Sequence, residues 1–132
     1  MYYVSVVEWE VEYTDQFEEW WSSLSGDEQV VITAAVEVLG EEGPALRRPL
    51  VDVVKRSRHA NMKELRPSTT IRILFAFDPR QTAILLIGGD KSGSWNRWYD
   101  EMIPVGDDLY DEHLAELKRQ GLLEERRSSE GR

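Results

Sequence analysis

The sequence predicts an α+β domain in which an N-terminal helical hairpin packs on a mainly antiparallel sheet of about four strands, with further helices near the C-terminus. Two segments between residues 15 and 41 carry apolar side chains at helical spacing. Two segments between residues 70 and 87 are rich in Ile, Leu, Phe and Thr and flank a turn that contains proline, which is typical of neighbouring strands. A chain of 132 residues is long enough for one core and too short for two. We therefore expect a single domain over residues 1–122 and a charged, disordered tail over residues 123–132.

The first elements are expected to be a strand and a short helix. Residues 4–11 alternate apolar and polar side chains, which indicates a strand. Asp15 and Glu18 have the spacing of a capping box at the start of a helix. Four apolar side chains then follow at i, i+3, i+4 and i+7, and this spacing favours core packing over base stacking: Phe17, Trp20, Trp21 and Leu24.

A second helix is expected over residues 27–41. Ser25 and Glu28 have capping-box spacing, and Gly43-Pro44 supplies a stop signal. The apolar face of this helix is expected to consist of Val31, Ala34, Ala35, Val38 and Leu39. The two helices together must bury their apolar stripes against a sheet.

The middle of the chain is expected to form an antiparallel meander over residues 62–66, 70–77 and 82–87, after a loop with a short strand over residues 46–58. The first strand is expected to lie beside the third strand of the meander. Strand periodicity places Ile71, Ile73 and Phe75 on one face, and Arg72, Leu74 and Ala76 on the other. The core is expected to contain Trp20, Trp21, Val31, Val38, Ile71, Ile73, Phe75, Leu85 and Ile87.

Beyond the meander, residues 88–93 (GGDKSG) are expected to form a flexible turn. Helical spacing of Trp95, Trp98 and Tyr99 indicates a helix over residues 94–102 that Pro104 ends. A loop over residues 105–108 and a last helix over residues 109–120 complete the expected elements.

Composition excludes several classes of site. The chain has no cysteine, which excludes disulfides and thiolate chemistry and is consistent with the cytoplasm. His59 and His113 are the only histidines and no ligand spacing is apparent, so neither a metal site nor another cofactor is predicted. The GGDKSG segment lacks the spacing of a phosphate-binding P-loop. No apolar run approaches the ~20 residues of a membrane span, and the N-terminus lacks the basic region of a signal peptide.

The net charge of −9 is unevenly distributed. Residues 1–45 contain 11 acidic and no basic side chains, whereas residues 46–100 contain 11 basic and 5 acidic ones. Residues 101–132 are acidic again. A basic middle between acidic flanks indicates a local site for an anionic partner, since local potential decides partner choice more than net charge does.

Four segments of the chain, taken in order, resemble the RelE/ParE toxin superfamily: MKELR, IRILFAFDP, AILLIGGDKSG and WNRWYDEMIP. They are most similar to its phage Gp49-like, HigB-type branch, and the resemblance extends from about Trp9 to about Leu117. It implies a RelE-like fold and the toxin of a type II toxin–antitoxin system that cleaves ribosome-bound mRNA. It also implies a cognate antitoxin, expected to be a helix-turn-helix protein of the HigA/Xre type.

The resemblance implies a site made of cations. In such toxins the RNA 2′-hydroxyl attacks the neighbouring phosphate, so the protein supplies alignment and positive charge and needs no metal. By position, the expected catalytic residues are Arg72, Arg66 and Lys91, and the expected RNA-binding residues are Lys63, Arg80, Arg97 and Tyr99. Arg72 is expected to project from a helix-free face of the sheet, where the cations could also receive an acidic segment of the antitoxin. Two alternatives stay open: a ParE-like toxin that binds DNA gyrase without catalysis, and a decayed toxin that only binds its antitoxin.

Overall fold

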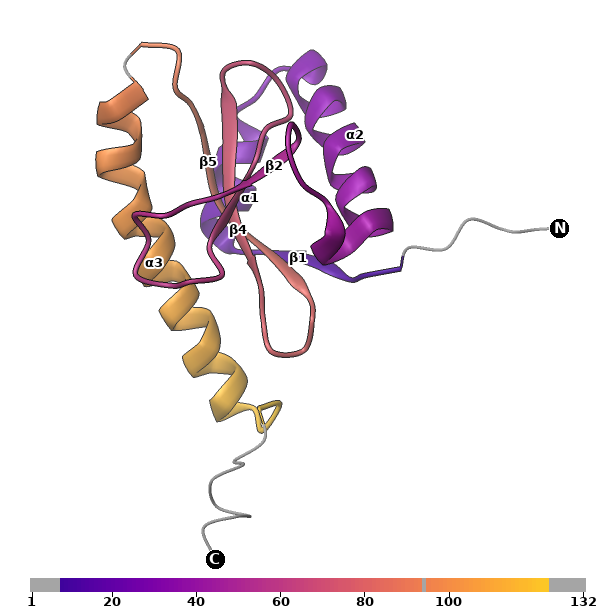
Figure 1. Cartoon of the computed structure of the whole chain (residues 1–132), viewed down its shortest axis with the longest axis vertical. Coiled ribbons are helices and arrows are strands. Elements are labelled where there is room, and N and C mark those ends of the chain that lie inside the picture. Colours follow the sequence, from indigo (N-terminus) through magenta and orange to yellow (C-terminus); the bar gives the residue numbers. More distant parts are fainter. Residues whose placement is uncertain (1–7, 94, 124–132) are drawn as a thin grey trace, which may run out of the picture.

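The computed structural model of the chain describes residues 8–93 and 95–123. It contains a sheet of five strands in the order β1-β5-β4-β3-β2 (Figure 1). The strands are β1 Val11–Tyr13, β2 Val51–Val53, β3 Lys63–Leu65, β4 Ile71–Phe77 and β5 Ala83–Asp90. Neighbours pair antiparallel except β1 and β5, which are parallel. The α+β class is confirmed, and β2 makes the sheet one strand larger than expected. The first strand lies beside the third strand of the meander, as expected, but it spans Val11–Tyr13, and residues 8–10 of the segment expected to form it are not strand.

Helices α1 (Asp15–Ser22) and α2 (Gly26–Glu42) form the expected hairpin. The capping box of Ser25 and Glu28 is present as predicted. The cap of α1 was predicted wrongly, because the Thr14 hydroxyl, not Asp15, accepts the Phe17 amide at 3.0 Å. Thr14 is better placed since its hydroxyl also donates to the Leu86 carbonyl, which fixes the start of the helix against β5.

After α2 the chain turns at Gly43, where φ is +61°, and a short 3₁₀ helix η1 (Gly43–Ala45) follows. A side chain at Gly43 would also meet the Trp9 ring at 2.3 Å. Glycine is therefore required here both for its backbone conformation and for the space it leaves.

Each face of the sheet carries its own apolar core. Ile71, Ile73 and Phe75 of β4 pack with residues of α1 and α2, and Leu74 and Ala76 pack on the other face with residues of α3 (Trp95–Arg119). The predicted division of β4 into two faces is therefore confirmed. The expectation of a helix-free face is wrong, because α3 covers the side that bears Arg72, Leu74 and Ala76 (Figure 1).

A β-bulge divides the side chains of β5 between the two cores. The register between β4 and β5 shifts at Leu74/Phe75, where Leu86 is left without a partner. Leu85 consequently joins the core under α1 and α2, whereas Ile87 packs against the core under α3. The prediction that both belong to one core is wrong because a bulge resets the alternation of the strand.

The buried face of α2 also differs from the prediction. Its buried residues are Ile32, Ala35, Leu39 and Gly40, while Val31 is 40% exposed and Val38 is only partly buried. Trp20 and Trp21 of α1 are likewise only partly buried. The helix is apolar on more than one side, so its sequence alone did not determine which side faces the sheet.

The C-terminal region is a single helix, so the predicted break at Pro104 is wrong. α3 contains Pro104 in its interior and buries Ile103, Leu109, Tyr110 and Leu117. The ring of Pro104 lies on the exposed side. An interior proline costs about 3 kcal/mol of helix stability, and burial of two or more large side chains at roughly 1.5–3 kcal/mol each offsets that cost.

Some expectations concern residues outside the described ranges. These are residues 4–7 of the expected first strand, Ser94, and the expected tail except Leu123. Among the described residues, none of the helices is long and apolar enough to cross a membrane.

Candidate functional site

The three expected catalytic cations lie together, at the end of the sheet where β3 ends, β4 begins and β5 ends. Arg72 in β4 pairs with Gly89 in β5, and Leu65, the residue before Arg66, pairs with Ile73. The backbone amide of Lys91 donates to the Thr70 carbonyl at 2.9 Å. Strand alternation points the side chains of Arg66, Arg72 and Lys91 to the face that α3 covers.

Glu64 is the carboxylate at the centre of this group. Its side chain is 5% exposed and accepts hydrogen bonds from Arg66 Nε at 2.9 Å and from Arg66 Nη2 at 2.7 Å. Its second oxygen accepts the Tyr99 hydroxyl at 2.8 Å. Arg66 also reaches Asp52 of β2 at 3.2 Å. Glu64 therefore holds a strand cation and a helix hydroxyl in fixed positions.

Arg66 is the most accessible of the three cations, with 30% of its side chain exposed. Its partial burial acts to lower its pKa, but the hydrogen bonds and charges of Glu64 and Asp52 outweigh burial and raise the pKa. It stays protonated at any pH at which the protein folds. Of the three cations, Arg66 is therefore the one that a molecule in solution can reach.

Arg72 and Lys91 are both buried, on the face of the sheet that α3 covers. Arg72 is 6% exposed and donates from Nη1 to the carbonyls of Ser68 and Ile71, both at 2.9 Å. The Lys91 side chain is fully buried, and burial, followed by the charge of Arg72, lowers its pKa. A lysine with a lowered pKa gives up its proton more readily than a free one, as a proton donor requires.

Two glycines in β5 let aromatic rings lie directly on the sheet beside these cations. A side chain at Gly88 would meet the Trp20 ring at 2.3 Å, and one at Gly89 would meet Trp98 Nε1 at 2.2 Å. The prediction of a flexible turn is therefore wrong for residues 88–90, which belong to β5. These glycines serve close packing on both faces, since only glycine leaves room for the rings.

Tyr99 connects α3 to the group of cations. Burial raises its pKa, and its hydrogen bond to Glu64 acts in the same direction, while Arg72 opposes the shift. Its ring contacts Trp98 edge-on, with the ring centroids 5.2 Å apart. The hydroxyl therefore stays protonated and donates to Glu64 beside Arg72.

The other expected RNA-binding residues are not all near this group. Lys63 precedes Glu64 and points to the opposite face, where burial and then Arg47 lower its pKa. Arg97 is exposed on the first turns of α3, at the same end as Tyr99. Arg80 follows the far end of β4, whose last residue, Phe77, lies roughly 17 Å from Arg72 at about 3.4 Å per residue.

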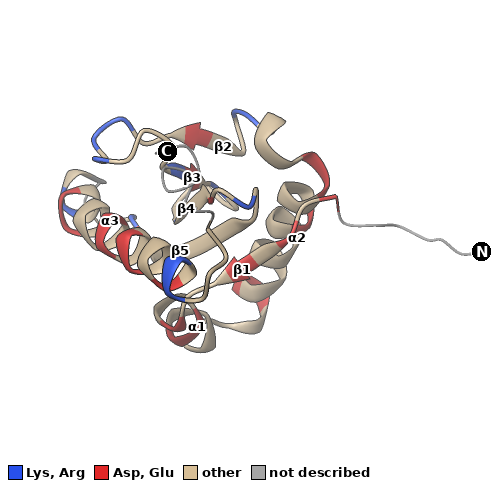
Figure 2. Cartoon of the chain, turned by 90° about the horizontal axis from the view of Figure 1, so that it is seen from below, with Lys and Arg blue, Asp and Glu red and all other residues tan. Residues whose placement is uncertain are grey.

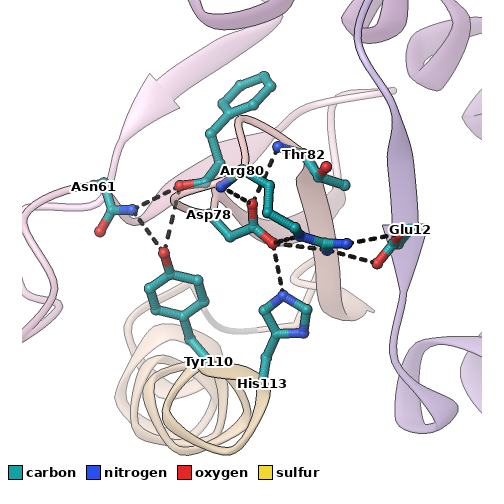
Figure 3. A network of polar contacts seen from close by, with 8 residues as sticks. Glu12, Asn61, Asp78, Arg80, Thr82, Tyr110 and His113 are labelled. Carbon is teal, nitrogen blue, oxygen red and sulfur yellow. Dashed lines mark hydrogen bonds and ion pairs between the residues drawn. The ribbon is translucent and has the colours of Figure 1, made fainter. Parts of the chain in front are cut away.

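Arg80 belongs to a separate network around Asp78, shown in Figure 3. The Asp78 side chain has no exposed surface and accepts Arg80 Nε at 3.0 Å, Arg80 Nη2 at 2.8 Å and His113 Nε2 at 2.8 Å. It also accepts the backbone amides of Arg80 and Thr82. Arg80 extends to Glu12 of β1 at 2.9 Å. The network joins the β4–β5 turn to α3 and β1, so its role is structural.

Sequence reasoning missed the carboxylates at both places. The sequence did not indicate that Glu64 would accept from both Arg66 and Tyr99, or that Asp78 would be the centre of a buried network. The one available signal was that Glu64, two residues before Arg66, shares its strand face. Among the described residues, no group of three or more His, Asp and Glu could hold a metal ion.

The fold defines the class of protein as RelE-like. The structure matches a chain of the RelE–RelB complex from Pyrococcus horikoshii OT3 with a TM-score of 0.54 and 13% identity, over 66% of this chain and 99% of that one. A chain of the RelBE2 toxin–antitoxin complex from Mycobacterium tuberculosis matches with a TM-score of 0.51 and 17% identity, over 65% of this chain and 94% of that one. Identities this low show a common fold only.

Sequence similarity identifies the family. Residues 19–111 match the family model described as phage derived protein Gp49-like (DUF891), and this chain belongs to that family. HigB3 of Mycobacterium tuberculosis, named as a toxin, is 54% identical over 101 residues, which cover 76% of this chain and 89% of HigB3. HigB2 of the same organism, also named as a toxin, is 52% identical over 103 residues. That match covers 75% of this chain, which spans about half the length of HigB2. The expected relation to Gp49-like, HigB-type proteins is confirmed.

Proposed function

We propose that this chain is the toxin of a type II toxin–antitoxin pair and that it cleaves mRNA bound to the ribosome. The observation that carries the proposal is the convergence of Arg66, Arg72, Lys91 and Tyr99 around Glu64 in a Gp49-like chain. The relation to two proteins named as HigB toxins supports it. The proposed partner is a cognate antitoxin of the helix-turn-helix type, and the proposed place of action is the cytoplasm.

The proposed reaction uses the RNA as its own nucleophile. The 2′-hydroxyl gives up its proton to water as its oxygen bonds to the adjacent phosphorus. The bond from phosphorus to the 5′-oxygen of the next nucleotide breaks and that oxygen receives a proton, which leaves a 2′,3′-cyclic phosphate and a free 5′-hydroxyl. Arg66 and Arg72 would stabilise the negative charge that develops on the phosphate, and a guanidinium fork suits two of its oxygens. Lys91, with its lowered pKa, would donate the proton to the leaving oxygen.

The described arrangement is a closed one. Glu64 is hydrogen-bonded to Arg66, and the side chains of Arg72 and Lys91 are buried. In the proposed mechanism the RNA phosphate replaces Glu64 as the ligand of Arg66, while Tyr99 and its turn of α3 move aside. Binding to the ribosome would supply the free energy for this exchange, and an isolated RNA would be cut slowly.

The test is cleavage of a defined mRNA in a translating extract, with the 5′ ends mapped by primer extension. Arg72→Ala should reduce the cleavage rate about 10²–10³-fold, since one transition-state contact is removed. Arg72→Lys should restore it only in part, because lysine lacks the fork. Arg119→Ala is the matched control, as the Arg119 side chain is 66% exposed and pairs with Glu116 at the C-terminal end of α3.

Circular dichroism and urea unfolding of each variant separate a loss of chemistry from a loss of fold. The catalytic assignment fails if folded Arg72→Ala protein cuts as fast as the wild type. If the wild type itself cuts no mRNA, the nuclease proposal fails, and inhibition of DNA gyrase supercoiling then becomes the activity to assay.

A further inference from the structure

A pocket of about 400 Å³ lies between η1, the edge strand β2 and the start of β3. Three cations are among its lining residues, Arg47, Arg48 and Lys63, and we call it the β2 pocket. Of the described residues that line it, Asp52 alone is acidic. Figure 2 shows basic positions in the chain on both sides of β2, whereas α1 and α2 carry acidic positions and no basic ones. The β2 pocket therefore concentrates positive charge on a chain whose net charge is −9.

The carboxylate of Asp52 is already engaged by other groups. Its Oδ1 accepts the Val53 amide at 2.8 Å, and its Oδ2 accepts Arg66 Nη2 at 3.2 Å. Arg48 Nε lies 3.9 Å from Oδ1, at the outer limit of an ion pair, and the Arg48 side chain is 74% exposed. Asp52 thus balances the charge of Arg66 more than the charge of the pocket, and the pocket stays positive.

Arg47 and Lys63 act on each other as like charges. Within residues 8–93 and 95–123, no carboxylate forms an ion pair with either side chain. Burial, followed by the charge of Arg47, lowers the pKa of Lys63. Two cations that line one partly enclosed pocket repel each other, and a bound anion would relieve this repulsion. The β2 pocket is therefore suited to an anionic ligand.

A second hollow, of about 330 Å³, adjoins the β2 pocket, since Pro44 and Lys63 line both. Its lining also includes two aromatic residues, Phe77 and Tyr110, and the amide residue Asn61. Lys63 Nζ lies 5.8 Å from the centroid of the Phe77 ring, so the cations and the aromatic surface are next to each other. A nucleotide uses this combination, because its phosphate binds cations and its base stacks on aromatic rings.

We propose that the β2 pocket binds the phosphate group of a nucleotide and that the attached base lies in the adjoining hollow. The guanidinium of Arg47 would donate to two phosphate oxygens and the ammonium of Lys63 to a third, through charge-assisted hydrogen bonds.

Two sources carry this chemistry: a unit of an RNA strand and a free nucleotide. The observations favour the strand, because β2 is an edge of the sheet and Asp52 connects the β2 pocket to Arg66 around that edge. The attribution to an RNA strand rests on the nuclease function proposed above. In that case the RNA is attached at a second point, apart from the phosphate that is cut.

The test is calorimetric titration of the full chain with 5′-AMP, with ribose 5-phosphate, with a short single-stranded RNA whose 2′-hydroxyls are methylated, and with a glutamate-rich peptide. Methylation removes the nucleophile of the proposed cleavage, so binding is measured without cutting. 5′-AMP should bind saturably and more tightly than ribose 5-phosphate, since its base adds stacking. The methylated RNA should bind more tightly than 5′-AMP, with affinity that falls as salt rises.

The variants remove cations from the β2 pocket. Arg47→Gln should weaken 5′-AMP and the methylated RNA about tenfold, because one charge-assisted contact is lost, and Arg47→Gln/Arg48→Gln should weaken them further. Both side chains are exposed, so the fold should be intact, which circular dichroism checks. Arg119→Gln is the matched control, since it removes the same charge from an exposed side chain beside a hollow that Glu12 of β1 lines, at the opposite edge of the sheet. Its affinities should equal those of the wild type.

Each outcome decides the question. Absence of saturable binding, or equal affinities of the Arg47→Gln and Arg119→Gln proteins, would overturn the phosphate site. Equal binding of 5′-AMP and ribose 5-phosphate would overturn the place of the base. Methylated RNA that binds no more tightly than 5′-AMP would overturn the strand and assign the pocket to a free nucleotide. A glutamate-rich peptide that binds as tightly as the methylated RNA, and is weakened by Arg47→Gln, would assign the pocket to an acidic protein segment instead.

These measurements do not depend on cleavage. If the wild type cuts no mRNA but binds the methylated RNA through Arg47, the nuclease proposal fails and the phosphate site stands. If mRNA is cut and the Arg47→Gln and Arg119→Gln proteins bind the methylated RNA equally, the phosphate site fails and the nuclease proposal stands.

Discussion

Replacement of Asp78 by asparagine should destabilise the fold by about 3 kcal/mol. One Asp78 oxygen accepts two donors of Arg80 and one of His113, and the other oxygen accepts two backbone amides. Asparagine keeps the shape of the side chain but replaces one carboxylate oxygen by an amide NH₂ group, which is a donor. That group would then face N–H donors of the network at a side chain without exposed surface. Removal of one partner of a buried ion pair costs about 3–5 kcal/mol. We take the lower end of this range because the Arg80 side chain is 27% exposed and keeps its ion pair with Glu12 in the variant.

The measurement is urea unfolding followed by tryptophan fluorescence at pH 7. With a slope of about 2 kcal/mol per M, the midpoint should fall by roughly 1.5 M. Asp108→Asn is the matched control, because Asp108 pairs with Arg58 on the surface with 69% of its side chain exposed, and its midpoint should not move. An Asp78→Asn midpoint within about 0.3 M of the wild type would show that the network contributes little and that our reasoning on buried charge is wrong.

The same network makes stability depend on pH. Burial acts to raise the Asp78 pKa, but the hydrogen bonds of His113, Arg80 and the turn amides outweigh it and hold the pKa below its ordinary value of 3.8. A carboxylate with a lowered pKa in the folded state contributes stability that is present above its unfolded pKa and is lost as pH falls through the folded one. The difference between wild type and Asp78→Asn should therefore be constant above about pH 5 and shrink below pH 3.8.

Two further substitutions test the packing. Phe75→Ala should cost about 3–5 kcal/mol in unfolding free energy, since the Phe75 side chain is fully buried between α1, α2 and the sheet; a cost under ~1 kcal/mol would contradict the core described here. Gly88→Ala should lower the melting temperature and change tryptophan fluorescence, because the added methyl group would meet the Trp20 ring at 2.3 Å. Gly26→Ala is the control: a methyl group there would meet nothing within 4 Å, so the melting temperature should not fall.

Local patterns predicted the elements of this chain and most of their order. The capping box at Ser25 and the two faces of β4 agree with the structure. These features depend on residues close in sequence, or on an alternation of period two, both of which can be seen without tertiary structure.

The predictions that failed are those in which a local signal competed with packing. Pro104 is a strong helix breaker, yet α3 continues through it because apolar side chains on both sides of Pro104 bury against the sheet. The side of α2 that is buried was undetermined, since the helix is apolar on more than one side. The bulge in β5, which separates Leu85 from Ile87, is set by its pairing with β4 and leaves no signal in its own sequence.

In the candidate site, too, some features could be predicted from the sequence and others were set by tertiary packing. The sequence by itself, through its resemblance to a toxin family, determined which cations to consider, and the tertiary structure brought Arg66, Arg72 and Lys91 together. Only the tertiary structure decided that Glu64 joins them as the acceptor of Arg66 and Tyr99, and that Arg80 instead pairs with Asp78 at the other end of β4. The physical reason is that the partner of a charge is chosen by proximity in space. Ion pairs in this chain join residues as far apart as Glu12 and Arg80, or Asp78 and His113, and their spacing in sequence carries no periodic signal.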